Sequence, residues 1–177
     1  SFLGGGKAPA TLFTLSASAP DPGQLTRTAA AGQAVTIANP VLAKGLRTNR
    51  VAVEVGPTQV QYVKGVQLLD RPDRLFQQLL SETLRRTTGR IVLAPGQSVL
   101  DPGVLVTGEL QRFGYDSATG QVVVQYDAML STEGGARVES RRFTASAPAD
   151  GTQRTVPDAL NTAANQVALD VARWIGG

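Results

Sequence analysis

The feature that most constrains how this chain can fold is a series of three long segments with the pattern of β-strands, at residues 104–113, 121–130 and 136–145. In the middle segment, apolar and aromatic residues occupy every second position: Val122, Val124, Tyr126, Ala128 and Leu130. Such alternation is typical of a strand with one buried face and one wetter face. Because glycine-containing turns separate the segments, we predict an antiparallel meander.

A first amphipathic helix is predicted from Asp70 to about Thr88. Asp70 is expected to cap it, and Pro72 and Asp73 suit its first turn. Gln77 is assigned to the solvent side, and Gly89 is a plausible stop. The apolar face has helical spacing and comprises Leu75, Phe76, Leu79, Leu80, Thr83 and Leu84.

A second helix is predicted from Thr155 to Trp174 or Ile175, again with a capping threonine followed by proline and aspartate. Its apolar stripe comprises Leu160, Ala164, Val167, Val171 and Trp174. Shorter β-type runs lie at residues 11–15, 34–37, 50–55, 59–63 and 91–93.

Together these elements indicate an α/β fold, with a mixed, largely antiparallel sheet and two helices packed on one face. Residues 1–10 are rich in glycine and are expected to be a flexible N-terminal tether. Residues 11–177 are expected to form a single domain, and residues 16–32 a surface segment without regular structure.

Composition removes most familiar catalytic chemistry. The 177 residues include no cysteine and no histidine, so thiolate and imidazole groups are missing, and these are the commonest nucleophiles, general bases and metal ligands. The glycines before Lys7 do not make a phosphate-binding loop, since Ala8 stands where serine or threonine would hold Mg²⁺. We predict no enzyme activity, no metal and no cofactor.

Two carboxylates need separate consideration because they fall on adjacent predicted strands. Glu109 and Asp127 could be neighbours there, and a pair of carboxylates can hydrolyse glycosides if one has a raised pKa. We favour the alternative that they are exposed carboxylates beside arginines.

The net charge of +3 comes without long basic runs, so no nucleic-acid partner is expected.

The last strand of the meander offers a candidate surface for self-association or partner binding. An edge strand exposes backbone groups that a neighbour can complete, and its charged side chains discourage indiscriminate pairing. The residues assigned to this surface are Arg137, Glu139, Arg141, Arg142 and Phe143.

Three stretches resemble the ABC-type transport auxiliary lipoprotein family, in its PqiC-like, Mce-linked form. Phe13-Thr14-Leu15 is similar to the family's early strand. Residues 48–76, from Thr48 to Phe76, are similar to its strand, turn and helix, although Leu68 stands where an aromatic residue is frequent. Val106 to Phe113 resembles a later strand of the family, so the resemblance spans about residues 11–175.

The resemblance implies a non-catalytic periplasmic lipoprotein subunit that assembles or docks a lipid-transport conduit at the outer membrane. It implies an Mce-type periplasmic protein as partner and, through it, a permease and an ATPase. It also implies a lipid anchor on a cysteine preceding Ser1, and we expect a homo-oligomer. The alternative is a periplasmic binding module that itself holds a lipid or other apolar ligand between sheet and helices.

Overall fold

The computed structural model describes residues 11–30, 32–97 and 103–176. The predicted tether at residues 1–10 lies outside the described residues. Four strands precede each of two helices, in the order β1 Val35–Ile37, β2 Val41–Leu42, β3 Arg50–Gly56, β4 Gln59–Gln67, α1 Pro72–Thr87, β5 Val92–Leu93, β6 Val104–Asp116, β7 Gln121–Thr132, β8 Arg137–Pro148 and α2 Val156–Ile175. Short 3₁₀ turns lie at Lys44–Leu46 and Glu133–Gly135.

Strand β6 organises the sheet. Along one side it pairs antiparallel with β7, which pairs antiparallel with β8. Along the other side it pairs in parallel with β1, β2 and β3 in turn, and β5 and β4 flank β1 and β3. The predicted meander and the mixed, largely antiparallel sheet are therefore confirmed.

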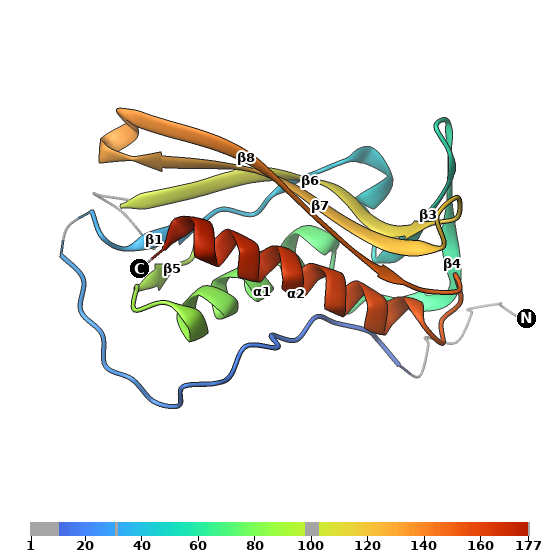
Figure 1. Cartoon of the computed structure of the whole chain (residues 1–177), viewed down its shortest axis with the longest axis horizontal. Helices are drawn as coiled ribbons and strands as arrows, with labels where there is room; N and C mark the ends of the chain where they lie inside the picture. Colours follow the sequence, from blue (N-terminus) through green and yellow to red (C-terminus); the bar gives the residue numbers. More distant parts are fainter. Residues whose placement is uncertain (1–10, 31, 98–102, 177) are drawn as a thin grey trace, which may run out of the picture.

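Both helices lie against the same face of this sheet (Figure 1). The alternating residues of β7 that we predicted to face inward are all buried, and so is the predicted apolar face of α1. The rings of Phe76 from α1 and Tyr126 from β7 meet at a centroid distance of 4.9 Å. Gly108 of β6 lies beside this contact, and a Cβ atom there would come within 2.6 Å of the Tyr126 ring. This close approach of backbone to ring requires glycine.

Helix α1 departs from its prediction at both ends and at one position in the middle. Arg71 is the N-cap residue and no side chain caps the helix, so the assignment of Asp70 was wrong. Thr88 ends the helix in an extended conformation, and its hydroxyl donates to the Leu84 carbonyl at 2.7 Å. Gln77 is buried, not solvent-facing, because its amide donates to Ile37 O and Ser81 Oγ.

Helix α2 begins after Thr155 as predicted, but the Thr155 hydroxyl does not cap it. That hydroxyl donates to the Asp150 carboxylate instead, as does the hydroxyl of Thr152. These hydrogen bonds, with that from Thr155 the strongest influence, lower the pKa of Asp150 to about 2. The loop between β8 and α2 is thus held by a compact polar turn.

The short strands differ from the prediction in two places. Residues 11–15 form no strand, and only Phe13 makes an isolated parallel bridge, to Leu68. The short strand β2 was not predicted. It pairs with Glu109 and Leu110 of β6, where two residues of strand suffice because the long strand supplies the partner groups.

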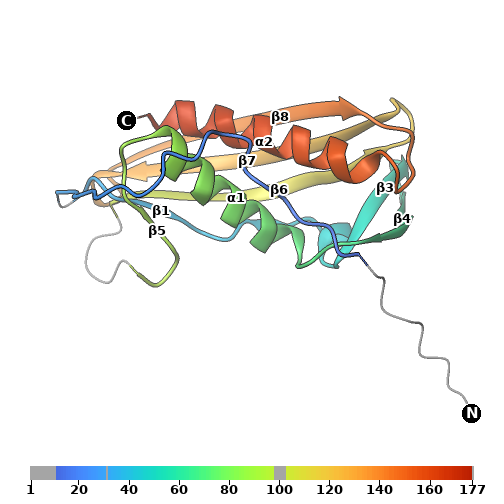
Figure 2. The same ribbon diagram turned by 90° about the horizontal axis from the view of Figure 1, so that it is seen from below.

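Residues 16–30 have no regular structure, as expected, and together with Thr14 and Leu15 they follow the side of the helices that faces away from the sheet (Figure 2). Sheet, helix pair and this segment make three successive layers (Figure 1). Among the described residues, neither helix combines the length and apolar character that crossing a bilayer requires.

Candidate functional site

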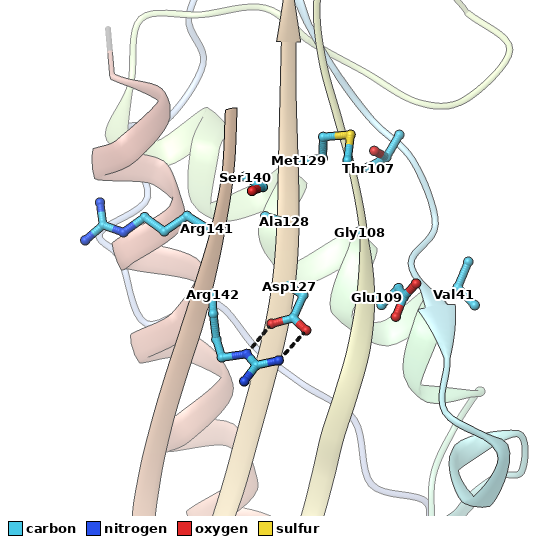
Figure 3. Close-up of a pocket in the computed structure, with 10 residues that line it drawn as sticks. All are labelled: Val41, Thr107, Gly108, Glu109, Asp127, Ala128, Met129, Ser140, Arg141 and Arg142. Carbon is cyan, nitrogen blue, oxygen red and sulfur yellow. Dashed lines mark hydrogen bonds and ion pairs between the residues drawn. The ribbon is translucent and has the colours of Figure 1, made fainter. Parts of the chain in front are cut away.

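No element among the described residues covers the face of the sheet opposite the helices, which carries a shallow hollow of about 740 Å³. Strands β6, β7 and β8 form its floor, and β2 lies along its rim (Figure 3). The residues that line it are Val41, Thr107, Gly108, Glu109, Asp127, Ala128, Met129, Ser140, Arg141 and Arg142.

A row of charged side chains crosses this hollow from strand to strand. Glu109, Asp127 and Arg142 are direct cross-strand neighbours. The Arg142 guanidinium donates twice to the Asp127 carboxylate, at 2.7 and 3.0 Å (Figure 3). The row therefore contains one bidentate ion pair and a second carboxylate beside it.

Asp127 does not suit the role of a general acid. Hydrogen bonding from Arg142 lowers the pKa of Asp127, whereas a general acid of a glycosidase needs a raised pKa. The prediction that these strand carboxylates lie beside an arginine is confirmed for Asp127. Within the described residues no group of three or more potential metal-binding side chains comes together.

A second cross-strand row is neutral. Thr107, Met129 and Ser140 face each other one step further along the strands. Met129 is 46% exposed, and the nearby side chains of Val41 and Val138 are 60% and 54% exposed. Exposed apolar groups beside a charged row are a composition suited to contact with another macromolecule.

Strand β8 places the five predicted surface residues on different sides. Arg137, Glu139, Arg141 and Arg142 are exposed, as expected. Phe143 is buried, which corrects its assignment: its ring packs against Trp174 of α2 at a centroid distance of 5.4 Å. Arg141 lies over the Phe143 ring at 5.1 Å and points away from Arg142 (Figure 3). Only Arg142 of the five therefore belongs to the charged row of the open face.

Strand β8 pairs with β7 alone among the described strands, so its outer side is an open sheet edge. Such an edge presents backbone N–H and C=O groups to any extended segment that lies alongside. The candidate site therefore combines an open edge at β8 with the open face beside it.

Three residues that line the hollow were not predicted from sequence: Val41, Met129 and Ser140. A signal was available, because the register that buries Tyr126 and Ala128 turns Asp127 and Met129 to the opposite face. An ion-pair cluster was not predicted either: Arg112 bonds both Glu54 and Asp116, at 2.6 and 3.0 Å. This cluster joins β3 to β6, and its hydrogen bond to Glu54 is the main cause of a raised Arg112 pKa.

Comparison with known proteins identifies the class. Residues 13–172 match the family described as ABC-type transport auxiliary lipoprotein component. The chain belongs to this family. Membership associates it with ABC-type transport and with lipoproteins of the cell envelope, and the family is an auxiliary component, not a known enzyme family.

Two solved structures share the fold. Protein XCC0632 from Xanthomonas campestris has a TM-score of 0.73 and 18% identity, over 93% of this chain and 94% of that one. A second structure, of an uncharacterized protein, has a TM-score of 0.67 and 15% identity, over 85% of this chain and 97% of that one. No protein of curated function matches the sequence.

Proposed function

We propose that this chain is a non-catalytic periplasmic subunit that docks or assembles an ABC/Mce-type lipid-transport conduit at the outer membrane. In this proposal an N-terminal lipid holds it to the membrane, and an Mce-type periplasmic protein connects it to the permease and the ATPase. The observation that carries the proposal is the open edge of β8 beside an uncovered sheet face, in a chain of this transport family.

The open edge favours a protein partner or a second copy of the chain. Arg137, Glu139 and Arg141 lie exposed along it. Because opposite charges on a partner strand would pair with them and like charges would be repelled, they can select the partner and its register. Self-association through repeated contact of one edge with another surface gives a ring when the rotation between copies closes.

The packing between sheet and helices argues against the alternative of an internal ligand module. Buried side chains of both helices and of β6 and β7 pack together in one core, among them Phe76, Tyr126 and Val167. The hollow on the open face has an ion pair on its floor. An apolar ligand would have to cover these charges, which is unfavourable unless it satisfies them.

The test begins with sedimentation of the chain, followed by capture with its cognate Mce-type protein. We expect self-association or a complex at tens of micromolar or below, which is about −6 kcal/mol or stronger. Arg137→Glu with Arg141→Glu should abolish it. Arg154→Glu, an exposed arginine in the turn before α2, is the matched control and should bind as wild type. A chain that stays monomeric and does not bind the partner contradicts the proposal. If that monomer carries co-purified lipid, the binding-module alternative is favoured.

The proposed anchor has an independent test. We expect the native protein to fractionate with membranes and to carry an acylated cysteine directly before Ser1, detected by mass analysis of its N-terminus. A single acyl chain binds a bilayer only weakly, so stable attachment needs more than one. A native protein without acylation contradicts this part of the proposal.

A further inference from the structure

The two helices hold an extended segment of the same chain in the way that a peptide-binding groove holds a peptide. This strap, residues 13–19, crosses the helices on the side away from the sheet (Figure 2). Its side chains alternate: Phe13, Leu15 and Ala17 pack against the core and Ala19 is buried, whereas Thr14, Ser16 and Ser18 are exposed. An extended peptide with alternate residues inserted is a recurrent mode of peptide recognition.

Helix α2 binds the backbone of the strap through two asparagines one turn apart. The Ser16 N–H donates to Asn161 Oδ1 at 2.9 Å, and the Ser18 N–H donates to Asn165 Oδ1 at 2.8 Å. Asn165 Nδ2 in turn donates to Ser16 O at 2.9 Å. Asn165 therefore meets an N–H and a C=O of the strap at once, and it is almost fully buried. Its amide replaces the neighbouring strand that an extended segment would have in a sheet.

Helix α1 holds the other side of the strap. The Arg86 guanidinium donates to the carbonyl oxygens of Ala17 and Ala19, at 3.5 and 2.9 Å. Glu82 accepts from Arg86 Nε at 2.9 Å and so fixes the guanidinium in place. The polar contacts from both helices end on strap backbone atoms, so they select an extended conformation and not a particular sequence.

The strap leaves part of the surface beside it unfilled. A hollow of about 590 Å³ lies along it, bordered by Leu15 and Ala17 of the strap and by Gln78 and Arg85 of α1. The chain from residue 20 to residue 30 is almost entirely exposed and has no regular structure. A connection of this length can span roughly 30 Å when extended. Release of the strap would break the backbone hydrogen bonds of Phe13 with Gln67 and Leu69 at the end of β4, but none of the pairings between the named strands.

We propose that the α1–α2 surface is a peptide-binding groove occupied in cis by residues 13–19, and that its trans ligand is the same segment of a second copy. The structure shows that this segment fits the groove, because its backbone bonds to Asn161, Asn165 and Arg86. Exchange of an identical element between copies keeps every contact and changes only the connection, which makes it a low-cost route to association. Cis binding prevails for dilute chains, and crowding of many copies on one surface favours trans binding.

The groove is tested with the full chain, cut once. A protease site inserted between Gly23 and Gln24, both exposed, allows the strap to be severed from the folded chain and diluted away. A fluorescent peptide of residues 11–23 should then bind saturably, as measured by anisotropy. Absence of saturable binding at millimolar peptide overturns the groove.

Backbone recognition is tested on the peptide, which leaves the protein unaltered. Replacing the Ser18 N–H by an ester oxygen removes the bond to Asn165 and should weaken binding about fivefold or more. The same replacement at Leu12, which is exposed, is the matched control and should bind as the parent peptide. Equal weakening by both esters would overturn backbone recognition by Asn165.

A protein variant gives the reciprocal result. Asn165→Ala removes both bonds to the strap backbone and should weaken peptide binding about tenfold or more. Gln166 is the next residue on α2 and also carries an amide, which bonds only to Asp170 among the described side chains. Gln166→Ala should therefore leave peptide binding unchanged. Unchanged affinity in Asn165→Ala overturns the assignment of this residue to the groove.

Exchange between copies is tested by mixing. A donor chain with Asn161→Ala and Asn165→Ala keeps an intact strap but lacks the hydrogen bonds from α2 that hold it in cis, and a cut, emptied chain is the acceptor. Sedimentation should reveal a one-to-one complex that saturating free peptide abolishes. A mixture that stays monomeric although the free peptide binds overturns trans exchange. None of these measurements involves an Mce protein, so their failure is separate from failure of the proposed function.

Discussion

The two faces of the sheet contrast in what lies against them and in how their side chains are satisfied. On the helix side, β6 and β7 contribute residues that are almost wholly buried, such as Val106, Leu110 and Tyr126. On the open side, their neighbours in sequence are polar or partly exposed, and Asp127 is satisfied by an ion pair. One strand thus serves two roles through its alternation: stability comes from one face, and the other is free for contact with partners.

The contrast predicts that truncating a side chain lowers the free energy of unfolding far more on the covered side than at an exposed position. Leu80→Ala removes a side chain with no exposed surface and should lower the free energy of unfolding by about 2–5 kcal/mol. Leu69→Ala, at a leucine that is 56% exposed just before α1, is the matched control and should cost well under 1 kcal/mol. Urea denaturation measures both. Similar losses in the two variants would contradict the packing of α1.

The next largest loss of stability should come from adding a side chain within the sheet itself, between its two faces. Gly108→Ala places a methyl group within 2.5 Å of the Asp127 carbonyl oxygen and against the Tyr126 ring. Overpacking of this kind costs about 1–3 kcal/mol. At Gly45 a Cβ atom would make an ordinary 3.5 Å contact with Val60, so Gly45→Ala is the control. If Gly108→Ala melts at the wild-type temperature, the strands are further from the ring than described.

The covered face was largely predictable from sequence because its signals are local. Alternation in β7 extends from Val122 to Leu130 and helical spacing in α1 from Leu75 to Leu84, so the buried sides of both elements follow from the chain itself. The open face follows from the same alternation, since Asp127 must point opposite to Tyr126 and Ala128. The sequence also indicated that Glu109 and Asp127 are neighbours, which the register confirms.

The wrong predictions concern residues whose burial depends on partners distant in the sequence. Phe143 sits among arginines, and only the end of α2 beside it, with Trp174, makes it a core residue. Gln77 reads as a surface residue until Ile37 supplies a carbonyl forty positions away. The strap is a stronger case, because Ser16 and Asn165 lie 149 positions apart and no periodicity connects them. Side-chain partners of this kind require the tertiary structure.

A smaller effect, of opposite sign, is expected from one polar atom on the covered side. The Tyr126 hydroxyl is buried and has no hydrogen-bond partner among the described residues, and burial raises the pKa of Tyr126 far above its usual value. Tyr126→Phe removes this unsatisfied group and keeps the ring. Stability should be unchanged or higher by about 1 kcal/mol. A loss above that value in urea denaturation would indicate that a bound water satisfies the hydroxyl.

The smallest stability effect should belong to the ion pair of the open face, and its sign depends on pH. Arg142 lowers the pKa of Asp127 in the folded chain relative to the value of about 3.9 in an unfolded one. The unfolded state therefore binds a proton first on acidification, so the pair stabilises the fold above about pH 4 and this contribution is lost as the pH falls through the folded pKa. Asp127→Asn should melt slightly below wild type at pH 7 and like wild type near pH 2.

Salt and a second variant separate this pair from general charge effects. Solvent screens an exposed arginine, so about 1 M salt should shrink the difference at pH 7. Glu109→Gln removes a charge from the same row but leaves the Asp127–Arg142 pair intact, so it should lack the pH-dependent loss of Asp127→Asn. If both variants respond to pH alike, the row acts only through its net charge. A separate measurement is binding of Asp127→Asn to the Mce-type partner. If this variant binds like wild type, the ion pair does not contribute to docking, and the contact surface lies at the β8 edge alone.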